Sequence, residues 1–417
     1  MTTTLSSLWR RYGGAFPLYI SQGFSALVPF LVAPLILKYS SIDELGVYAG
    51  WMTLATFLCI FSEYSFDYLG PKLLSGIEKN NELTFMGSVI RSKIVLLIVS
   101  MPLVTPLVFM VFQRGPTFAE MISLYGLGLG LALCNYWYFI YLGKSILVAL
   151  TNIASKVILV ILVIGYIYVS PVIEGRVIFS LHALSALASG TYIYIFRISS
   201  KQASRSGFSV FQLLREGRLL FLSNLSGSLI SISGPLAIGV AANEAGMAIY
   251  HAADKSARLV SAVYKPILQW GYSRSIRSFA ASFRQGVERL AEFRSILLWT
   301  LSLLLLAVLF FGGDFLNFFF DKEVSEKGAL VFQLLTIWVS IGIVNNCNGL
   351  QGLVANGKYR QYNRAMLGAL CVVALSACLT IYGGFTDYGV IMALGLILAE
   401  AFAFVVILVA YREMGQQ

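Results

Sequence analysis

Charged side chains are scarce in this sequence. Asp, Glu, Lys and Arg make up 12% of the 417 residues, against about 25% in an ordinary soluble domain, whereas 58% of the residues are hydrophobic. The apolar residues recur in runs along the whole chain, separated by short polar segments. A soluble protein of this length would need many more charges to cover its surface. The composition therefore excludes a soluble enzyme or binding module and predicts an all-α integral membrane protein.

Residues that bind metals or cofactors are also rare. The chain has two histidines and five cysteines, and no two cysteines form a C-x-x-C pair. The run Gly126-x-Gly128-x-Gly130 follows no predicted strand, so it indicates close helix packing rather than a dinucleotide site. We expect no metal site and no cofactor. The N-terminus lacks a small-residue cleavage site after a short apolar core, so we also expect no signal peptide.

Twelve apolar segments of about 20 residues predict twelve transmembrane helices. They cover residues 15–38, 46–66, 88–112, 119–142, 153–171, 177–197, 219–241, 246–270, 294–316, 329–352, 365–384 and 389–411. No connection between them is long enough for a soluble domain.

The basic residues give the orientation. When each loop is counted together with the ends of its flanking spans, 22 of the 30 Lys and Arg residues, Lys93 and Lys156 among them, belong to the side that holds the N-terminus. Four belong to the other side, and the remaining four, Lys38, Lys255, Arg258 and Lys265, are placed within spans. The positive-inside rule then places both termini in the cytoplasm. It also explains the net charge of +10 without a nucleic-acid partner. Two basic inside segments, 198–218 and 271–293, are predicted to be amphipathic helices on the anionic inner leaflet.

The two halves of the chain resemble each other faintly. "PLILKYSSIDELGVYAG" begins at Pro34 and "PLAIGVAANEAGMAIYHA" begins at Pro235, and both segments link two predicted spans. A tandem duplication of six helices is an arrangement typical of transporters, in which the substrate cavity lies between the two halves. We therefore predict two six-helix lobes, 1–200 and 201–417, around a central cavity.

The span 246–270 carries a stripe of polar residues. His251, Asp254, Lys255 and Arg258 are spaced i, i+3, i+4, i+7, so they share one helix face, which Lys265 extends. Each charge would cost about 2.5–3.5 kcal/mol at the bilayer centre, so the stripe should face protein or water rather than lipid. It is either a structural ion-pair helix or, since it is net cationic, a surface for a phosphate-bearing substrate.

Other polar residues in the spans are weaker candidates. Lys38 either snorkels to the interface or lines the cavity. Glu63 and Asp67 are either interfacial or candidates for binding a coupling ion, as is the isolated Glu400. Asn345 and Asn346 either line a sugar-binding cavity or hydrogen-bond between helices.

Four segments carry a family resemblance. They are "DELGVYAGWMTLATFL" (43–58), "NYWYFIYLGKSILVALTNIASKVILVILV" (135–163), "LLFLSNLSGSL" (219–229) and "AIYHAADKSARLVSAVYKPILQ" (248–269). In this order they resemble the polysaccharide-transporter branch of the multidrug/oligosaccharidyl-lipid/polysaccharide (MOP) exporter superfamily, and most closely O-antigen flippases of the Wzx type. The resemblance implies a central cationic cavity and alternating access driven by a proton or sodium gradient.

The implied substrate is an undecaprenyl-pyrophosphate-linked O-antigen repeat unit. It would move from the cytoplasmic to the periplasmic leaflet of a bacterial inner membrane. Lys38, Lys255, Arg258 and Lys265 would contact pyrophosphate or sugar, and His251 and Asp254 would tune them. The implied partners are membrane lipids, the O-antigen polymerase and its chain-length regulator.

Two alternatives stay open. Another MOP exporter would carry a capsule or teichoic precursor or a drug, although a drug antiporter should favour an acidic cavity. An O-antigen polymerase or glycosyltransferase usually needs a large periplasmic loop with catalytic Arg, Asp or His. The longest outside loop, about 313–328, is short and has neither Arg nor His, which favours a transporter over an enzyme.

Overall fold

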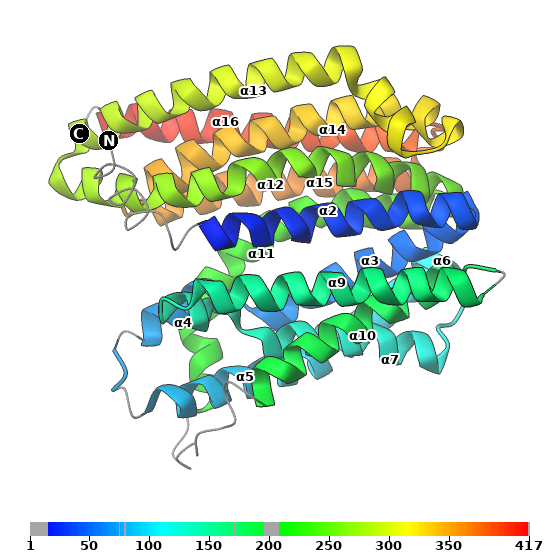
Figure 1. Ribbon diagram of the computed structural model, residues 1–417. Coiled ribbons are helices and arrows are strands. Elements are labelled where there is room, and N and C mark those ends of the chain that lie inside the picture. Colours follow the sequence, from blue (N-terminus) through cyan, green and yellow to red (C-terminus); the bar gives the residue numbers. More distant parts are fainter. Residues whose placement is uncertain (1–15, 75, 79–80, 171, 196–207, 416–417) are drawn as a thin grey trace, which may run out of the picture. The chain divides into compact units, whose positions relative to one another are not determined.

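The computed structural model describes residues 16–74, 76–78, 81–170, 172–195 and 208–415. All regular elements in these ranges are helices (Figure 1). The chain divides into two compact units, Met1–Ser228 and Leu229–Gln417. The predicted lobe boundary at 200/201 lies outside the described residues.

The first unit contains nine helices and the beginning of a tenth. They are α2 (Phe16–Tyr39), α3 (Ile42–Glu63), α4 (Phe66–Leu74), α5 (Glu82–Val99), α6 (Met101–Phe112), α7 (Phe118–Cys134), α8 (Tyr136–Tyr141), α9 (Ser145–Val169), α10 (Gly175–Ile193) and the first part of α11 (Val210–Ala241) among the described residues. The second unit holds the rest of α11, then α12 (Glu244–Ala281), α13 (Phe283–Phe319), α14 (Lys322–Asn348), the π-helical segment η3 (Gly349–Val354), α15 (Tyr359–Tyr382) and α16 (Tyr388–Gly415).

A helix lies at each of the twelve predicted spans, which confirms the all-α membrane fold. Within the described part of the chain, nine helices are long and apolar enough to cross a membrane, and α5 with α6, bent by 47°, makes up to ten. Neither α10 nor α12 is among them. The number of crossings therefore stays a prediction. For α12 the reason is its load of charged residues, which begins at Glu244 and continues through the polar stripe.

Small residues let helices approach closely in the first unit. A Cβ on Gly190 would lie 2.1 Å from the backbone oxygen of Gly130, and a Cβ on Gly130 would lie 2.5 Å from the carbonyl carbon of Ala186. These contacts join α7 to α10. Gly128 likewise faces Leu97, but Gly126 has no neighbour within 4 Å. The packing role expected of this glycine run is thus confirmed at two of its three positions.

Two of the predicted spans are interrupted by residues in the left-handed region. Asn135 has φ 37° and separates α7 from α8. Tyr64 and Ser65 have φ 44° and 61° and form the turn between α3 and α4. This turn is held by hydrogen bonds, since the Tyr64 hydroxyl donates to the oxygen of Leu214 at 2.8 Å and the amide of Asn224 donates to the Ser65 hydroxyl at 2.9 Å.

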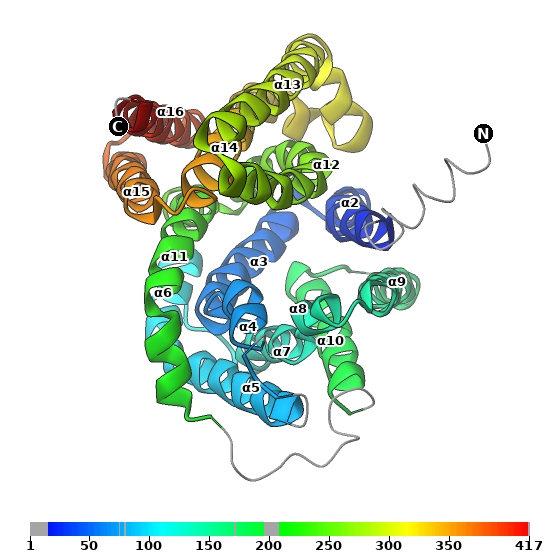
Figure 2. The same cartoon turned by 90° about the vertical axis from the view of Figure 1, so that its left-hand side faces the viewer.

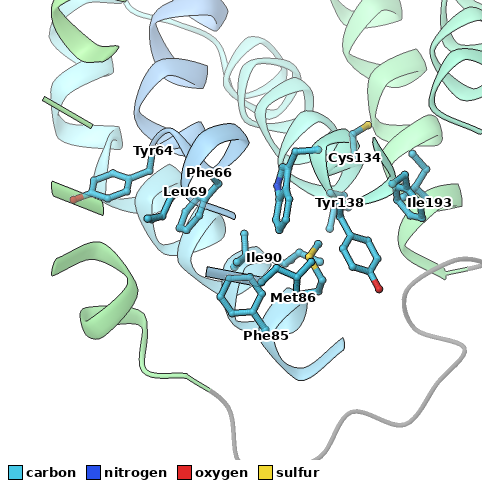
Figure 3. Packing of buried hydrophobic residues seen from close by; sticks show 14 of the residues in the cluster. Tyr64, Phe66, Leu69, Phe85, Met86, Ile90, Cys134, Tyr138 and Ile193 are labelled. Atoms are coloured by element: carbon cyan, nitrogen blue, oxygen red, sulfur yellow. The ribbon is translucent and has the colours of Figure 1, made fainter. Parts of the chain in front are cut away.

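An aromatic-rich cluster holds α4, α5 and α8 together. Figure 3 shows Phe85 and Met86 of α5 in one cluster with Phe66 of α4 and Tyr138 of α8. Trp137 is buried in the same cluster, and Gly70 leaves the space that its ring fills. Burial of these side chains stabilises this end of the unit, at about 1.5–3 kcal/mol for each large apolar side chain.

In the second unit, α14 is the central helix. It packs against α12, α13 and α16, and α15 packs against α16; Figure 2 shows these helices nearly end-on. Ser282 forms the only break between α12 and α13. Its N–H donates to the oxygen of Ser278, and its hydroxyl accepts from the N–H of Gln285, so one residue ends α12 and caps α13.

The described parts of the basic inside segments continue the long helices of the neighbouring spans. Residues 210–218 are the beginning of α11, and 271–293 are divided between the end of α12 and the start of α13. Residues 198–207 lie outside the described residues. Residues 271–293 are therefore helical apart from Ser282, because helical hydrogen bonding continues past the ends of the apolar runs. Their position on the inner leaflet stays a prediction.

Candidate functional site

The polar stripe lies in the middle of a long, well-formed helix. Asn243 caps α12, and its side chain accepts from the N–H of Gly246 at 2.9 Å. The helix then runs for 38 residues, about 57 Å at 1.5 Å per residue. A single helix therefore fixes the spacing of all the charged groups in the stripe.

Asp254 and Arg258 form the ion pair expected from their spacing. Nε of Arg258 donates to Oδ2 of Asp254 at 2.7 Å. Arg258 also reaches across to α11, where Nη1 donates to the Ser231 hydroxyl at 2.8 Å and Nη2 donates to the Ser231 backbone oxygen at 2.7 Å. Its guanidinium lies 5.4 Å from the ring centroid of Trp338 on α14. Three helices of the second unit thus hold one guanidinium.

This guanidinium is fixed but not enclosed. The side chain of Asp254 is 2% exposed, whereas that of Arg258 is 31% exposed. A guanidinium has five N–H donors, and the three hydrogen bonds to Asp254 and Ser231 leave it capacity for another acceptor. Arg258 can therefore form the structural ion pair with Asp254 and still bind an anion.

The other stripe residues differ in depth. His251 is buried, Lys255 is half-buried and Lys265 is exposed. In the described part of the chain, Oδ1 of Asp254 is buried with no hydrogen-bond partner. The carboxylate of Asp254 therefore points into the unit, whereas Lys255 and Lys265 are accessible at its surface.

Asn345 joins α14 to α16 through Glu400. Its amide Nδ2 donates to the backbone oxygen of Glu400 at 2.7 Å and to the carboxylate Oε2 at 2.6 Å. Gly342 gives this carboxylate room, because a Cβ there would lie 3.3 Å from it. Asn346 is half-buried beside this pair in the sequence. The two predicted candidates Asn345 and Glu400 are thus hydrogen-bonded to each other, and for Asn345 the link is one between helices.

The remaining candidates lie in the first unit. Glu63 at the end of α3 is paired with Lys93 of α5, with Nζ 2.7 Å from Oε2. Asp67 is exposed in the first turn of α4. Lys38 is exposed near the end of α2, with Nζ 5.4 Å from the ring centroid of Tyr39. Lys38 and Asp67 are therefore surface residues of this unit.

Lys93 was missed by the sequence interpretation, which counted it with the inside loops. Its side chain is 1% exposed, so it belongs to the interior of the unit. The signal that could have found it is its place in "VIRSKIVLLIV", where one face of an apolar helix carries a single charge. In the described ranges no three His, Cys, Asp or Glu side chains come together as a metal site.

Comparison with known proteins agrees with this architecture. Residues 13–270, more than half of the chain, match the family described as polysaccharide biosynthesis protein. No curated protein matches the sequence significantly.

Several solved structures share the fold. The lipid II flippase MurJ in an inward closed conformation has a TM-score of 0.70 at 15% identity, covering 96% of this chain and 87% of the other. A multidrug resistance MATE family transporter of the MOP superfamily has a TM-score of 0.65 when inward-facing, at 14% identity, covering 96% and 95%. An outward-facing conformation of such a transporter has a TM-score of 0.61, also at 14% identity, covering 96% and 94%.

Proposed function

The chain belongs to the polysaccharide biosynthesis protein family, and on this premise we propose that it is a flippase for lipid-linked oligosaccharides. Its substrate is an undecaprenyl-pyrophosphate-linked O-antigen repeat unit, moved from the cytoplasmic to the periplasmic leaflet of a bacterial inner membrane. The family supports a saccharide, and the fold shared with MOP superfamily transporters supports movement across a membrane.

The observation that carries the choice of substrate is the cationic stripe on α12. Arg258 is held by Asp254 and Ser231 and still 31% exposed, and Lys255 and Lys265 extend the same face of the helix. Guanidinium and ammonium groups are the usual ligands of phosphate oxygens. Such a face would repel the cationic compounds that a drug antiporter carries.

The other candidates take supporting roles in this proposal. Lys38 adds a cation for the pyrophosphate, His251 and Asp254 set the position of Arg258, and Asn345 and Asn346 contact sugar. The coupling ion is a proton or sodium. Glu400 suits it better, because Glu63 is already paired with the charged Lys93 and Asp67 is exposed, whereas the carboxylate of Glu400 accepts from the neutral amide of Asn345.

The proposed substrate also predicts where the protein is located and which proteins it works with. We expect a multi-pass protein of the inner membrane with both termini in the cytoplasm, working beside the O-antigen polymerase and its chain-length regulator. Export of a capsule or teichoic precursor is the nearest alternative, since the same pyrophosphate chemistry would serve it. A polymerase or glycosyltransferase is the alternative of a different class.

Analysis of lipid-linked intermediates in a deletion strain tests the proposal. Loss of a flippase should leave single repeat units on the cytoplasmic leaflet, protected from a periplasmic glycosidase. Units that reach the periplasm but stay unpolymerised would identify a polymerase and overturn the proposal.

Variants of the stripe test its role in the same strain. Lys255→Ala and Lys265→Ala should each reduce the lipopolysaccharide ladder at unchanged protein level. Lys322→Ala is the matched control, because Lys322 is 83% exposed and pairs only with the neighbouring Glu326 among the described residues. Normal lipopolysaccharide ladders from both stripe variants would show that the stripe is not needed for transport.

A further inference from the structure

Three amide side chains follow one another near the end of α14 in the second unit. They are Asn345 and Asn348 of α14 and Gln351 of η3, each three residues from the next. All three are buried, since Asn345 is 4% exposed and Asn348 and Gln351 are 0% exposed. Side chains three residues apart on a helix are neighbours, with about 5–6 Å between their Cβ atoms. The three amides therefore form a polar path through the interior of this unit.

Each of these amides uses one polar atom for a bond to a neighbouring helix. Asn345 binds α16 through Nδ2, Asn348 binds α13 through Oδ1 and Gln351 binds α12 through Nε2. Within the described ranges, the other polar atom of each amide is buried and has no hydrogen-bond partner. These atoms are Oδ1 of Asn345, Nδ2 of Asn348 and Oε1 of Gln351, which are an acceptor, a donor and an acceptor in turn.

This alternation indicates the kind of ligand that the path takes. A buried donor or acceptor without a partner carries its full cost of desolvation, and buried water molecules usually bind to such groups. Water both donates and accepts, so it can satisfy all three atoms. A metal cation would suit the two oxygen atoms but would be repelled by the N–H group of Asn348 between them. An anion would be repelled by the oxygen atoms of Asn345 and Gln351.

The backbone around Gln351 departs from the regular α-helix. Residues Gly349–Val354 form the π-helical segment η3, a conformation that is frequent at functional sites. Gly271 of α12 lets the amide of Gln351 approach closely, because a Cβ there would lie 2.6 Å from its Oε1. The last unpartnered oxygen of the path therefore lies against α12.

The other end of the path lies at a carboxylate. Oε2 of Glu400 accepts from Nδ2 of Asn345 at 2.6 Å, and Glu400 is half-buried. The first unpartnered atom of the path, Oδ1, belongs to the same amide group of Asn345. The path thus connects the surroundings of Glu400 with α12.

The neighbouring helices contribute few ionisable side chains. Those beside the path in the described part of the chain are Arg294 of α13, Cys347 of α14, Tyr362 of α15 and Tyr411 of α16. At α12 the path meets the backbone of Leu268 and Gly271. Glu400 is the carboxyl group among these neighbours, so it is the one that can gain and lose a proton in the usual range of acids.

We propose that the three amides bind a chain of internal water molecules, through which Glu400 exchanges protons with the cytoplasm. The inference rests on the proposed function, in which Glu400 binds the coupling ion, and it names that ion as a proton. Glu400 in its acid form gives a proton to the first water, each water passes one proton on, and the last water releases one beside Gly271. Glu400 is then a carboxylate. Gly271 begins the predicted inside segment 271–293, so this end of the path faces the cytoplasm.

Carbodiimide labelling of Glu400 tests the path from each side of the membrane. A hydrophobic carbodiimide reacts with carboxyl groups in their acid form, and mass spectrometry of the purified chain locates the product. The cytoplasmic face is outside in inverted membrane vesicles and inside in right-side-out vesicles, and the pH of the medium is varied at constant lumenal pH. In inverted vesicles, labelling should fall by up to about tenfold for each unit of increase in the medium pH. In right-side-out vesicles it should hardly respond.

Substitutions along the path should remove this response. Asn348→Leu takes away the middle donor and fills the space of a water molecule, so the response should be lost, whereas Asn348→Ser keeps a hydroxyl group and should retain it. Gln351→Met is a second blocking variant, and the thermal unfolding temperature identifies the variants that fold. Gln333→Leu is the matched control, because it removes another amide of α14, whose Nε2 donates to the backbone oxygen of Leu309 at 3.1 Å.

Several outcomes would overturn the proposal. In the parent these are an equal response from both sides, a response from the periplasmic side alone, or no response from either side. A response that survives in folded Asn348→Leu or Gln351→Met would also overturn it, as would protection of Glu400 by sodium chloride but not by choline chloride at constant pH. Labelling does not depend on the lipopolysaccharide ladder, so failure of the water path is distinguishable from failure of the proposed transport.

Discussion

Nζ of Lys93 lies 2.7 Å from Oε2 of Glu63, yet the lysine is 1% exposed and the glutamate 34%. The pair joins α3 to α5, and its two charges differ in their access to water. Removing one partner of a buried ion pair is costly because the other charge is left uncompensated. Because of this unequal burial, we expect substitutions of the two residues to destabilise the protein by different amounts.

Glu63→Gln should destabilise the protein more than Lys93→Met. The first leaves a buried ammonium without its carboxylate, at a cost of about 3–5 kcal/mol, whereas the second leaves a carboxylate that can still be hydrated. Thermal unfolding of the purified protein in detergent measures the difference. The double variant should recover most of the loss, and a double variant no more stable than Glu63→Gln would contradict this account.

Arg258→Lys should not substitute for the arginine. One ammonium cannot reach Asp254 and both oxygen atoms of Ser231 at once, because it lacks the planar fork of a guanidinium. We expect a lower unfolding temperature and a weaker lipopolysaccharide ladder. Combining Arg258→Ala with Asp254→Asn should restore stability but not the ladder. Restored transport in that double variant would show that Arg258 has only a structural role.

Glu400→Gln should separate stability from transport. A glutamine oxygen can still accept from Nδ2 of Asn345, so the link between α14 and α16 is kept and the unfolding temperature should hardly change. If the Glu400 charge binds the coupling ion, the ladder should fall to the level of the deletion strain. Asn345→Leu is the converse control and should lower the unfolding temperature. A normal ladder from Glu400→Gln would exclude this carboxylate as the coupling site.

Two neighbouring glycines should respond oppositely to alanine. Gly130→Ala places a methyl group against the backbone of α10 and should cost about 1–3 kcal/mol through overpacking. Gly126→Ala, one helical turn away in open space, should cost nothing and can gain up to about 1 kcal/mol, because alanine loses less entropy than glycine in a helix. Unfolding temperatures of both variants test this, and equal losses would refute the close α7–α10 contact.

Much of the fold was predictable because apolar length is a strong signal. Helices lie along every predicted span in the described part of the chain, although 46–66, 88–112 and 119–142 are each divided by a break, since a chain in a bilayer must satisfy its backbone hydrogen bonds internally. Helix ends were less predictable. The residues after 270 are polar, yet α12 continues through them to Ala281, because hydrogen bonding along a helix does not stop where hydrophobicity does.

The candidate site was predictable only where it is local. The Asp254–Arg258 pair follows from i,i+4 spacing, but Ser231 and Trp338 come from other helices, and the sequence does not indicate which side chains tertiary packing brings together. Lys93 and Lys156 were assigned to the inside flanks by charge counting. The structure places both within helices, one in an ion pair and one at a cavity.

The single-residue junction at Ser282 has a mechanical consequence. Because no loop separates α12 from α13, a tilt of α12 would be transmitted directly to the start of α13. A tilt of about 10° around the midpoint of a helix about 57 Å long moves each end by about 5 Å. A small tilt of α12 at the level of Arg258 would therefore produce a much larger displacement at the end of the helix, where α13 begins.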